Sequence, residues 1–167
     1  MSQNVTLALA RTMIEAARKR AEEIGVPMCI AVVDDGANLV AFDRMDGAWL
    51  GSIDIAQDKA FTARAFDITT KELAKLSQPG QPLFGITASN EGRVVIFAGG
   101  VALRHDGRVV GAVGSSGGEP DQDHEVAEAG AQAFRPTPRS DGLERRAHPQ
   151  SLRAREPSAL ELYPRST

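Results

Sequence analysis

Two Asp-Gly turns limit the fold that this 167-residue chain can adopt. The first turn, at residues 35–36, lies within a predicted hairpin over residues 28–44. The second, at residues 106–107, separates β-rich segments at 93–103 and 109–115. Because Asp-Gly favours the tight turns that join neighbouring strands, both pairs of strands are predicted to be antiparallel hairpins.

Helices are predicted before, between and after the two hairpins. Apolar residues at three- and four-residue spacing indicate amphipathic helices. Such patterns occur in four segments: residues 6–24, 52–66, 69–76 and 121–134. Thr6 is the expected N-cap of the first helix, and either Asp121 or Asp123 is the expected N-cap of the last.

The predicted order is therefore helix, hairpin, helices, hairpin, helix. Strands joined by short turns pair antiparallel, and the helices must cover the faces of the sheet. We expect an α+β fold with a central antiparallel sheet flanked by helices. The continuous apolar run at residues 28–33 predicts a strand that is covered on both faces.

Composition changes abruptly after Phe134. Residues 1–134 carry 12 basic and 18 acidic side chains, whereas residues 135–167 carry seven Arg, four acidic residues and five Pro, and contain no Val, Ile, Met or Phe. A segment so poor in large apolar residues does not bury enough surface to offset its ordering entropy. We expect a folded domain over 1–134 and a disordered Arg/Pro-rich tail over 135–167, either a native tail or an out-of-frame extension.

Composition also excludes several classes of protein. A hydrophobic content of 42% and a charged content of 25% are typical of soluble globular domains. No apolar run is long enough for a membrane helix and the N-terminus is unlike a signal peptide, so a cytoplasmic protein is expected. The net charge of -3 gives no reason to expect nucleic acid, and the single Cys29 precludes an internal disulfide.

A glycine-rich segment over residues 99–118 is the most informative stretch for function. Glycine within strands indicates close approach of another backbone or of a ligand. The turn at residues 115–118 leads into the last predicted helix, where free amides could hold a carboxylate or phosphate. Alternatively, Asp121 or Asp123 caps these amides itself.

This segment resembles a known family. Residues 99–130 read GGVALRHDGRVVGAVGSSGGEPDQDHEVAEAG, which is similar to the signature of the GlcG and HbpS haem-degrading family. The same domain forms the C-terminal part of some PduO-type adenosyltransferases. The resemblance extends to the strand segment PMCIAVVDDGANLVAFDRMDGAW and the helix DKAFTARAF, and so covers about residues 4–134.

The resemblance implies an α+β fold that assembles into homo-oligomers, from dimers to octamers. For some members it implies binding or oxidative breakdown of haem. We therefore expect a small-molecule ligand, with haem as the candidate cofactor, in a cleft between sheet and helices or between subunits. The ligand-binding residues carried over by resemblance are Lys59, Thr62, Gly99, Gly100, Ser116, Gly117, Gly118 and Gln122.

This chain departs from the family pattern at the expected iron ligand. Haem-binding members typically supply a histidine from or near the first helix, but residues 1–28 contain none. Residues 1–134 contain only His105 and His124, with Met45 and Cys29 as alternative soft ligands. Ala102 also replaces a proline that is common in the family, a change that leaves the expected fold intact.

Two other functions remain open. Asp34, Asp121, Asp123 and His124 are candidate catalytic residues, because carboxylates in different environments suit proton transfer. They would serve a cofactor-independent isomerase or lyase that acts on a small organic substrate in a catabolic pathway. Asp121, Asp123 and Glu125 also form a candidate divalent-metal site. The second alternative is a non-catalytic accessory subunit.

Overall fold

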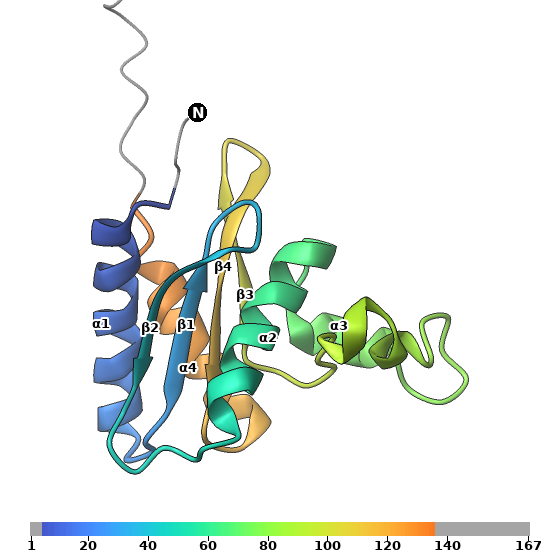
Figure 1. Cartoon of the computed structure of the whole chain (residues 1–167), viewed down its shortest axis with the longest axis horizontal. Coiled ribbons are helices and arrows are strands. Elements are labelled where there is room, and N and C mark those ends of the chain that lie inside the picture. The colour runs from blue at the N-terminus through green and yellow to red at the C-terminus, as the bar shows by residue number, and fades with distance from the viewer. Residues whose placement is uncertain (1–4, 136–167) are drawn as a thin grey trace, which may run out of the picture. The chain divides into compact units, whose positions relative to one another are not determined.

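The structure, a computed structural model, describes residues 5–135 (Figure 1). The predicted tail falls almost entirely on residues 136–167, which lie outside the described residues. The helices and strands, in chain order, are α1 (Leu7–Glu23), β1 (Cys29–Val33), β2 (Leu39–Arg44), α2 (Ser52–Phe66), α3 (Thr70–Leu76), the 3₁₀ turns η1 (Ile86–Ala88) and η2 (Asn90–Gly92), β3 (Gly100–His105), β4 (Arg108–Ser116) and α4 (Pro120–Gln132).

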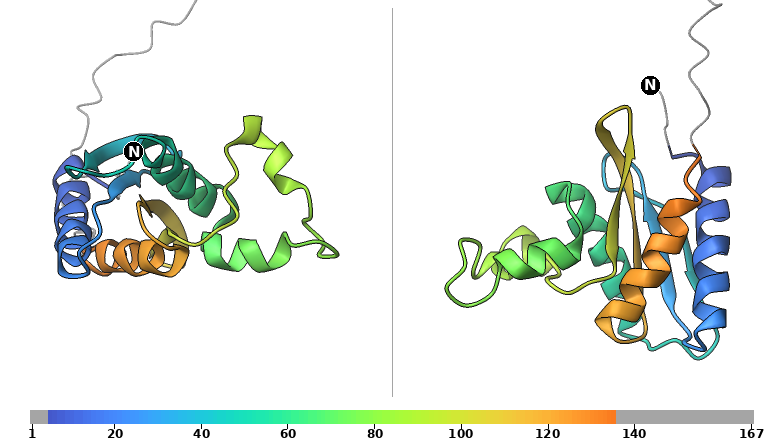
Figure 2. Two further views of the ribbon diagram at one scale, coloured as in Figure 1. Left: turned by 90° about the horizontal axis from the view of Figure 1, so that it is seen from below. Right: turned by 180° about the vertical axis from the view of Figure 1, so that it is seen from behind.

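The four strands form one antiparallel sheet in the order β2-β1-β4-β3. Helices α1 and α4 lie against one face of this sheet, and α2 lies against the other (Figures 1 and 2). The α+β fold predicted from the two hairpins is therefore confirmed. None of the helices within residues 5–135 is long and apolar enough to cross a membrane.

The sheet separates two apolar cores. Ile30, Val32 and Val113 face the core shared with α1 and α4. Cys29 and Ala31 face the second core, which is built largely from alanines and includes α2. All five residues of β1 are buried, so the prediction of a strand covered on both faces is confirmed.

The first helix and hairpin follow the local signals in the sequence. The Thr6 side chain accepts a hydrogen bond from the amide of Leu9 and caps α1, as predicted. In the first turn, one carboxylate oxygen of Asp34 accepts the amides of Gly36 and Asn38, both at 2.9 Å. Asp34 therefore stabilises the turn between β1 and β2.

The second hairpin begins later than predicted. Strand β3 starts at Gly100 rather than at residue 93, so the prediction of a strand over 93–99 is wrong. The chain before β3 is attached to α2 instead: the Thr62 hydroxyl donates to the Arg93 carbonyl at 3.2 Å and accepts the amide of Val95 at 3.0 Å. A side chain of α2 thus satisfies backbone groups that a strand would have paired.

The N-cap of α4 also differs from the prediction. Glu119 is the N-cap and Pro120 occupies the first turn, where the missing N–H of proline costs no hydrogen bond. Glu119 and Gln122 form a capping box, in which Gln122 Oε1 accepts the Glu119 amide at 2.9 Å. Asp121 and Asp123 lie inside the helix, so neither is its N-cap.

Residues 70–92 extend to one side of the sheet as an arm that contains α3 and both 3₁₀ turns (Figures 1 and 2). Helix α3 begins with a capping box between Thr69 and Glu72. Leu83 and Phe84 are exposed at 36% and 67% on this arm.

Candidate functional site

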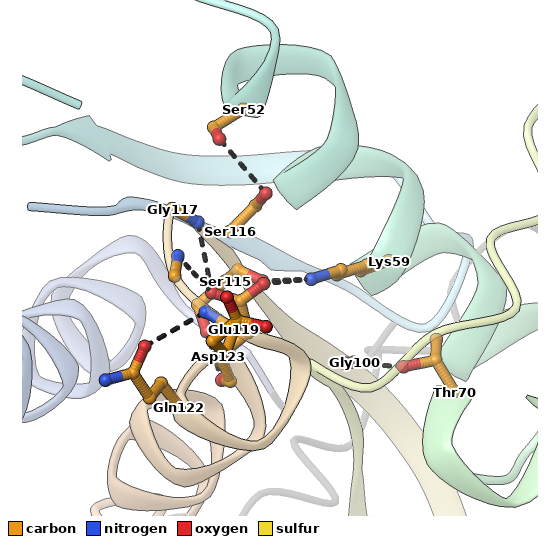
Figure 3. A network of polar contacts seen from close by, with 11 residues as sticks. Ser52, Lys59, Thr70, Gly100, Ser115, Ser116, Gly117, Glu119, Gln122 and Asp123 are labelled. Atoms are coloured by element: carbon orange, nitrogen blue, oxygen red, sulfur yellow. Dashed lines mark hydrogen bonds and ion pairs between the residues drawn. The ribbon is translucent and has the colours of Figure 1, made fainter. Parts of the chain in front are cut away.

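A buried ion pair joins α2 to α4 beside the glycine-rich segment (Figure 3). Lys59 Nζ lies 2.5 Å from Asp123 Oδ2 and donates a second hydrogen bond to the Ser115 carbonyl at 3.0 Å. The Phe97 ring covers the ammonium group, with its centroid 4.8 Å from Nζ. Lys59 is wholly buried and Asp123 is 2% exposed, so the pair is excluded from solvent.

The second carboxylate oxygen of Asp123 organises the loop that precedes α4. Asp123 Oδ1 accepts the amides of Gly117 and Gly118 at 3.0 and 2.9 Å. The interpretation in which an aspartate caps these amides is therefore confirmed for Asp123. Because the two amides already bind a carboxylate of the chain itself, they are not free to bind a phosphate or carboxylate ligand.

Glycines let the segment come close to the ion pair. Gly99 has a φ of +123°, and a Cβ atom there would lie 2.7 Å from Lys59 Nζ and 2.8 Å from Asp123 Cβ. A Cβ on Gly114 would lie 2.6 Å from the Ala60 amide of α2. The close approach predicted from glycines within strands is thus an approach of α2 and α4 to β3 and β4.

Burial shifts the pKa values of both members of the pair. Desolvation lowers the pKa of Lys59, and the negative charge of Asp123 opposes that shift. Desolvation likewise raises the pKa of Asp123, against the charge of Lys59 and the hydrogen bonds from Gly118 and Gly117. Both shifts oppose the charged forms, as expected for an ion pair that is buried away from water, while the attraction between the two charges and the hydrogen bonds to Asp123 act in the opposite direction.

The residues carried over by resemblance surround this pair. Ser116 Oγ donates to Ser52 Oγ at 3.1 Å, and the Thr70 hydroxyl accepts the Gly100 amide at 2.9 Å (Figure 3). The polar groups of these residues are thus used within the chain, where they join α2, α3, β3, β4 and α4. Contact with a ligand remains a prediction for all of the carried-over positions: Lys59, Thr62, Gly99, Gly100, Ser116, Gly117, Gly118 and Gln122.

The predicted catalytic aspartates are not brought together. Cys29 of β1 pairs with Ser116, so the loop beside Asp123 adjoins the start of β1, whereas Asp34 follows its end. Asp121 is exposed and pairs with Lys71 of α3 at 2.9 Å. Asp34 therefore stabilises a turn, Asp121 forms a surface ion pair, and only Asp123 is buried.

The candidate metal site is also absent from the structure. Its three carboxylates bind three different cations: Asp121 binds Lys71, Asp123 binds Lys59 and Glu125 binds Arg20. Within residues 5–135, no group of three His, Cys, Asp or Glu side chains is arranged to hold a metal ion.

The candidate iron ligands lie in separate places. His105 Nε2 is 3.5 Å from Asp106 at the tip of the second hairpin. His124 Nε2 is 3.3 Å from Glu128, and its Nδ1 is buried without a partner among the described residues. Cys29 is wholly buried, and the Met45 sulfur accepts the Met28 amide at 3.4 Å.

A groove of about 390 Å³ lies between α1 and β2, away from the ion pair. Its lining residues are Leu7, Arg11, Ile14, Glu15, Val40, Ala41, Phe42 and Asp43. This groove lies between a helix and the sheet, but the sequence analysis selected none of its residues, and binding of a ligand in such a cleft stays a prediction. The sequence pattern that could have indicated this groove is the helical spacing of Leu7, Arg11 and Ile14, which places a cation within an apolar stripe of the first helix.

Comparison with known proteins finds a matching family and several similar proteins. Residues 5–132 match the family described as haem degrading protein HbpS-like. The chain is 42% identical over 130 residues to an uncharacterized 15.0 kDa protein in the dhaT-dhaS intergenic region of Citrobacter freundii, covering 78% of this chain and 92% of that protein. It is 36% identical over 108 residues to protein GlcG of Escherichia coli K12, covering 65% of this chain and 78% of GlcG.

Among solved structures, the chain is similar to PduOC in its complex with haem. The TM-score is 0.75 at 36% sequence identity, over 77% of this chain and 94% of PduOC. The family resemblance drawn from the glycine-rich segment is therefore confirmed by the sequence match and by the fold. This chain belongs to the HbpS-like family of haem degrading proteins.

Proposed function

We propose that this chain binds haem in the groove between α1 and β2. The observation that carries the proposal is the similarity of fold to PduOC, whose structure is a complex with haem, over 94% of that chain. The groove adds a concave surface of about 390 Å³ to which a small organic molecule can bind.

Part of the lining of the groove suits the organic part of haem. Leu7, Val40 and Ala41 supply aliphatic surface beside the carboxylates of Glu15 and Asp43, and Leu7 is 49% exposed, so a flat ring would remove it from water. Arg11 supplies a guanidinium group that can pair with a propionate. The lining contains no His, Cys, Met or Tyr, so these residues do not fit the iron.

Titration of the full chain with haem tests the proposal. Binding should saturate at one haem per chain with a shift of the Soret band. Leu7→Glu places a charge where the ring would lie and should weaken binding by about fivefold or more, since burial of a partly exposed leucine contributes about 1 kcal/mol. Leu83→Glu is the matched control on the arm and should bind haem as the parent does.

A titration that does not saturate would refute haem binding. An equal loss of haem affinity in the Leu7→Glu and Leu83→Glu variants would contradict the placement of the haem site in the groove. The family description names haem degradation, and oxidative breakdown of haem is a further proposal for this chain. It predicts loss of the Soret band when a reductant and oxygen are added to the complex.

Acid–base catalysis by aspartate has one observation in its favour, the buried Asp123 with its raised pKa. Asp34 and Asp121 do not face this group, so the isomerase or lyase alternative rests on Asp123 and its partner Lys59. Turnover of a candidate substrate that survives Asp123→Asn would end that alternative. An accessory subunit would show neither a ligand nor turnover.

Assembly and location are also proposed from the family resemblance. A homo-oligomer, from dimer to octamer, would appear in sedimentation equilibrium as a multiple of the 17.8 kDa chain. A cytoplasmic location would appear as recovery of the protein in the cytosolic fraction of its source cells.

A further inference from the structure

The distal part of the arm, residues 76–90, is exposed and carries no charge. It contains no Asp, Glu, Lys, Arg or His, although charged residues make up 25% of the whole chain. Within it only Ser77 is buried and only Ile86 is half-buried. Depletion of charged residues beside exposed aromatic and apolar side chains is the composition found at the centre of protein interfaces. The distal arm therefore has the composition of an interface rather than of a solvated loop.

Apolar side chains are gathered on the distal arm. Phe84 is 67% exposed, Leu76 is 41% exposed and Leu83 is 36% exposed. The Leu83 amide donates to the Leu76 carbonyl at 2.9 Å, so the backbones of these two leucines lie side by side. The Phe84 amide donates to the Gln81 carbonyl at 3.1 Å. Because the arm pairs these backbone groups itself, a partner can cover the side chains without first ordering the segment.

A second exposed apolar surface lies in the loop between β2 and α2, residues 45–51. Leu50 and Trp49 are 74% and 71% exposed, more than any other large hydrophobic residue of the part that the structure describes. Trp49 is the single tryptophan of the chain, and tryptophan is enriched at the energetic centres of interfaces.

The two surfaces lie at opposite ends of α2. The loop precedes the first residue of this 15-residue helix and the arm follows its last turn (Figure 1). A helix of this length spans about 22 Å. The high exposure of Trp49 and Phe84 shows that neither surface covers the other within one chain.

The area and charge of these surfaces fit a second copy of the chain. The exposed fractions correspond to roughly 250 Å² on the arm and roughly 300 Å² at Trp49 and Leu50, whereas a stable interface buries about 800 Å² on each partner. Neither surface is large enough alone, but the two together supply more than half of that area. Two copies with a net charge of -3 repel each other, and contact through the uncharged distal arm adds no repulsion of its own.

We propose that two copies of this chain associate through reciprocal contacts, in which the distal arm of each packs against Trp49 and Leu50 of the partner subunit. A twofold axis relates the two copies, so each contact occurs twice and both surfaces of both chains are covered. Phe84 against the partner's Trp49 forms the aromatic centre of each contact. This inference rests on the proposed homo-oligomer and names the surfaces that form it.

Sedimentation equilibrium of the full chain and its variants tests the proposal. The parent should sediment as a dimer or a multiple of a dimer. Phe84→Glu and Trp49→Glu each place a charge in both contacts and should weaken association at least about 30-fold. Leu39→Glu, at a leucine of β2 that is 50% exposed and outside both surfaces, should leave association unchanged. Circular dichroism of each variant should match that of the parent, because all three side chains are exposed.

Disulfide crosslinking tests which surface meets which. Because Cys29 is the single cysteine and is buried, an introduced cysteine is the one exposed thiol of its chain. An equimolar mixture of Phe84→Cys and Trp49→Cys, with oxidised glutathione as the oxidant, should give a crosslinked dimer of one chain of each kind. Neither variant alone should crosslink efficiently, and Leu39→Cys should not crosslink to Phe84→Cys.

The outcomes separate this inference from the assembly on which it rests. A parent that sediments only as a 17.8 kDa monomer would end the proposed assembly. If the parent is oligomeric and Phe84→Glu associates as tightly, the assembly stands and the inference is overturned. Equal losses of association in Phe84→Glu and Leu39→Glu would also overturn it. Crosslinking of Phe84→Cys alone as readily as in the mixture would show that arm pairs with arm, which contradicts the reciprocal contact.

Discussion

Lys59 Nζ lies 2.5 Å from Asp123 Oδ2, and both side chains are excluded from solvent. Removing one charge leaves the other buried without a partner, which typically costs about 3–5 kcal/mol. We expect Asp123→Asn to lower the free energy of unfolding by this amount, measured by urea denaturation with circular dichroism. Asp121→Asn, at an exposed ion pair, should change it little.

A second variant distinguishes lost charge pairing from general damage at this site. The Lys59→Met/Asp123→Asn double variant should be more stable than Lys59→Met alone, because it removes the unpaired carboxylate. Additive losses in the double variant would show that the two charges are not coupled.

Close packing of α2 on β4 depends on Gly114. A Cβ atom at this position would meet the Ala56 carbonyl and lie 2.6 Å from the Ala60 amide, and helix backbone cannot move aside as a flexible side chain can. Gly114→Ala should therefore lower the melting temperature strongly, at a cost of about 3 kcal/mol or more. Gly51→Ala, with no atom within 4 Å of the new Cβ, should stay within about 0.5 kcal/mol of the parent. Equal stability of both variants would contradict the packing described here.

Acid should weaken the start of α3 through Glu72. Hydrogen bonds from the Thr69 amide and hydroxyl hold the pKa of Glu72 below its ordinary value. A carboxyl whose folded pKa is lower than its unfolded pKa stabilises the fold above the unfolded pKa, and this stabilisation is lost as the pH falls through the folded pKa. The stability difference between the parent and Glu72→Gln should therefore shrink between pH 6 and about pH 3. A difference that stays constant over this range would exclude the carboxylate as its source.

The single cysteine should resist thiol reagents in the folded chain. Cys29 is wholly buried, and desolvation raises the pKa of its thiol, so little reactive thiolate forms near neutral pH. Labelling with a disulfide reagent should be slow in buffer and complete within minutes in concentrated urea. Rapid labelling of the folded protein would indicate that β1 opens frequently.

Local patterns were sufficient for most of the fold. The helix predicted over 52–66 is α2, and the Asp-Gly turns lie between paired antiparallel strands, because periodicity and turn chemistry act over a few residues. The segment 93–99 was assigned to a strand because it is rich in β-branched residues. Its backbone binds Thr62 of α2 instead, a contact 31 residues away that no local pattern reveals.

The site was harder to predict for the same reason. Asp123 was assigned roles as a cap, a catalytic carboxylate and a metal ligand, but its ion-pair partner Lys59 lies 64 residues earlier in the chain, so no local pattern pairs the two. The groove was hard to predict for another reason. Its residues have the patterns of an ordinary amphipathic helix and an edge strand, and only the packing of the two elements makes a concave surface. Glycine spacing predicted close packing correctly but could not say that α2 and α4, rather than a ligand, fill the space.

The sequence separation of Lys59 and Asp123 also affects how the chain folds during synthesis. A ribosome adds residues from the N-terminus, so Lys59 emerges long before Asp123 and the Gly117–Gly118 amides that complete the pair. Until then its ammonium group must stay hydrated, and α2 cannot settle fully on the sheet. We therefore expect closure of the alanine-rich core to wait until α4 has been synthesised and has left the exit tunnel.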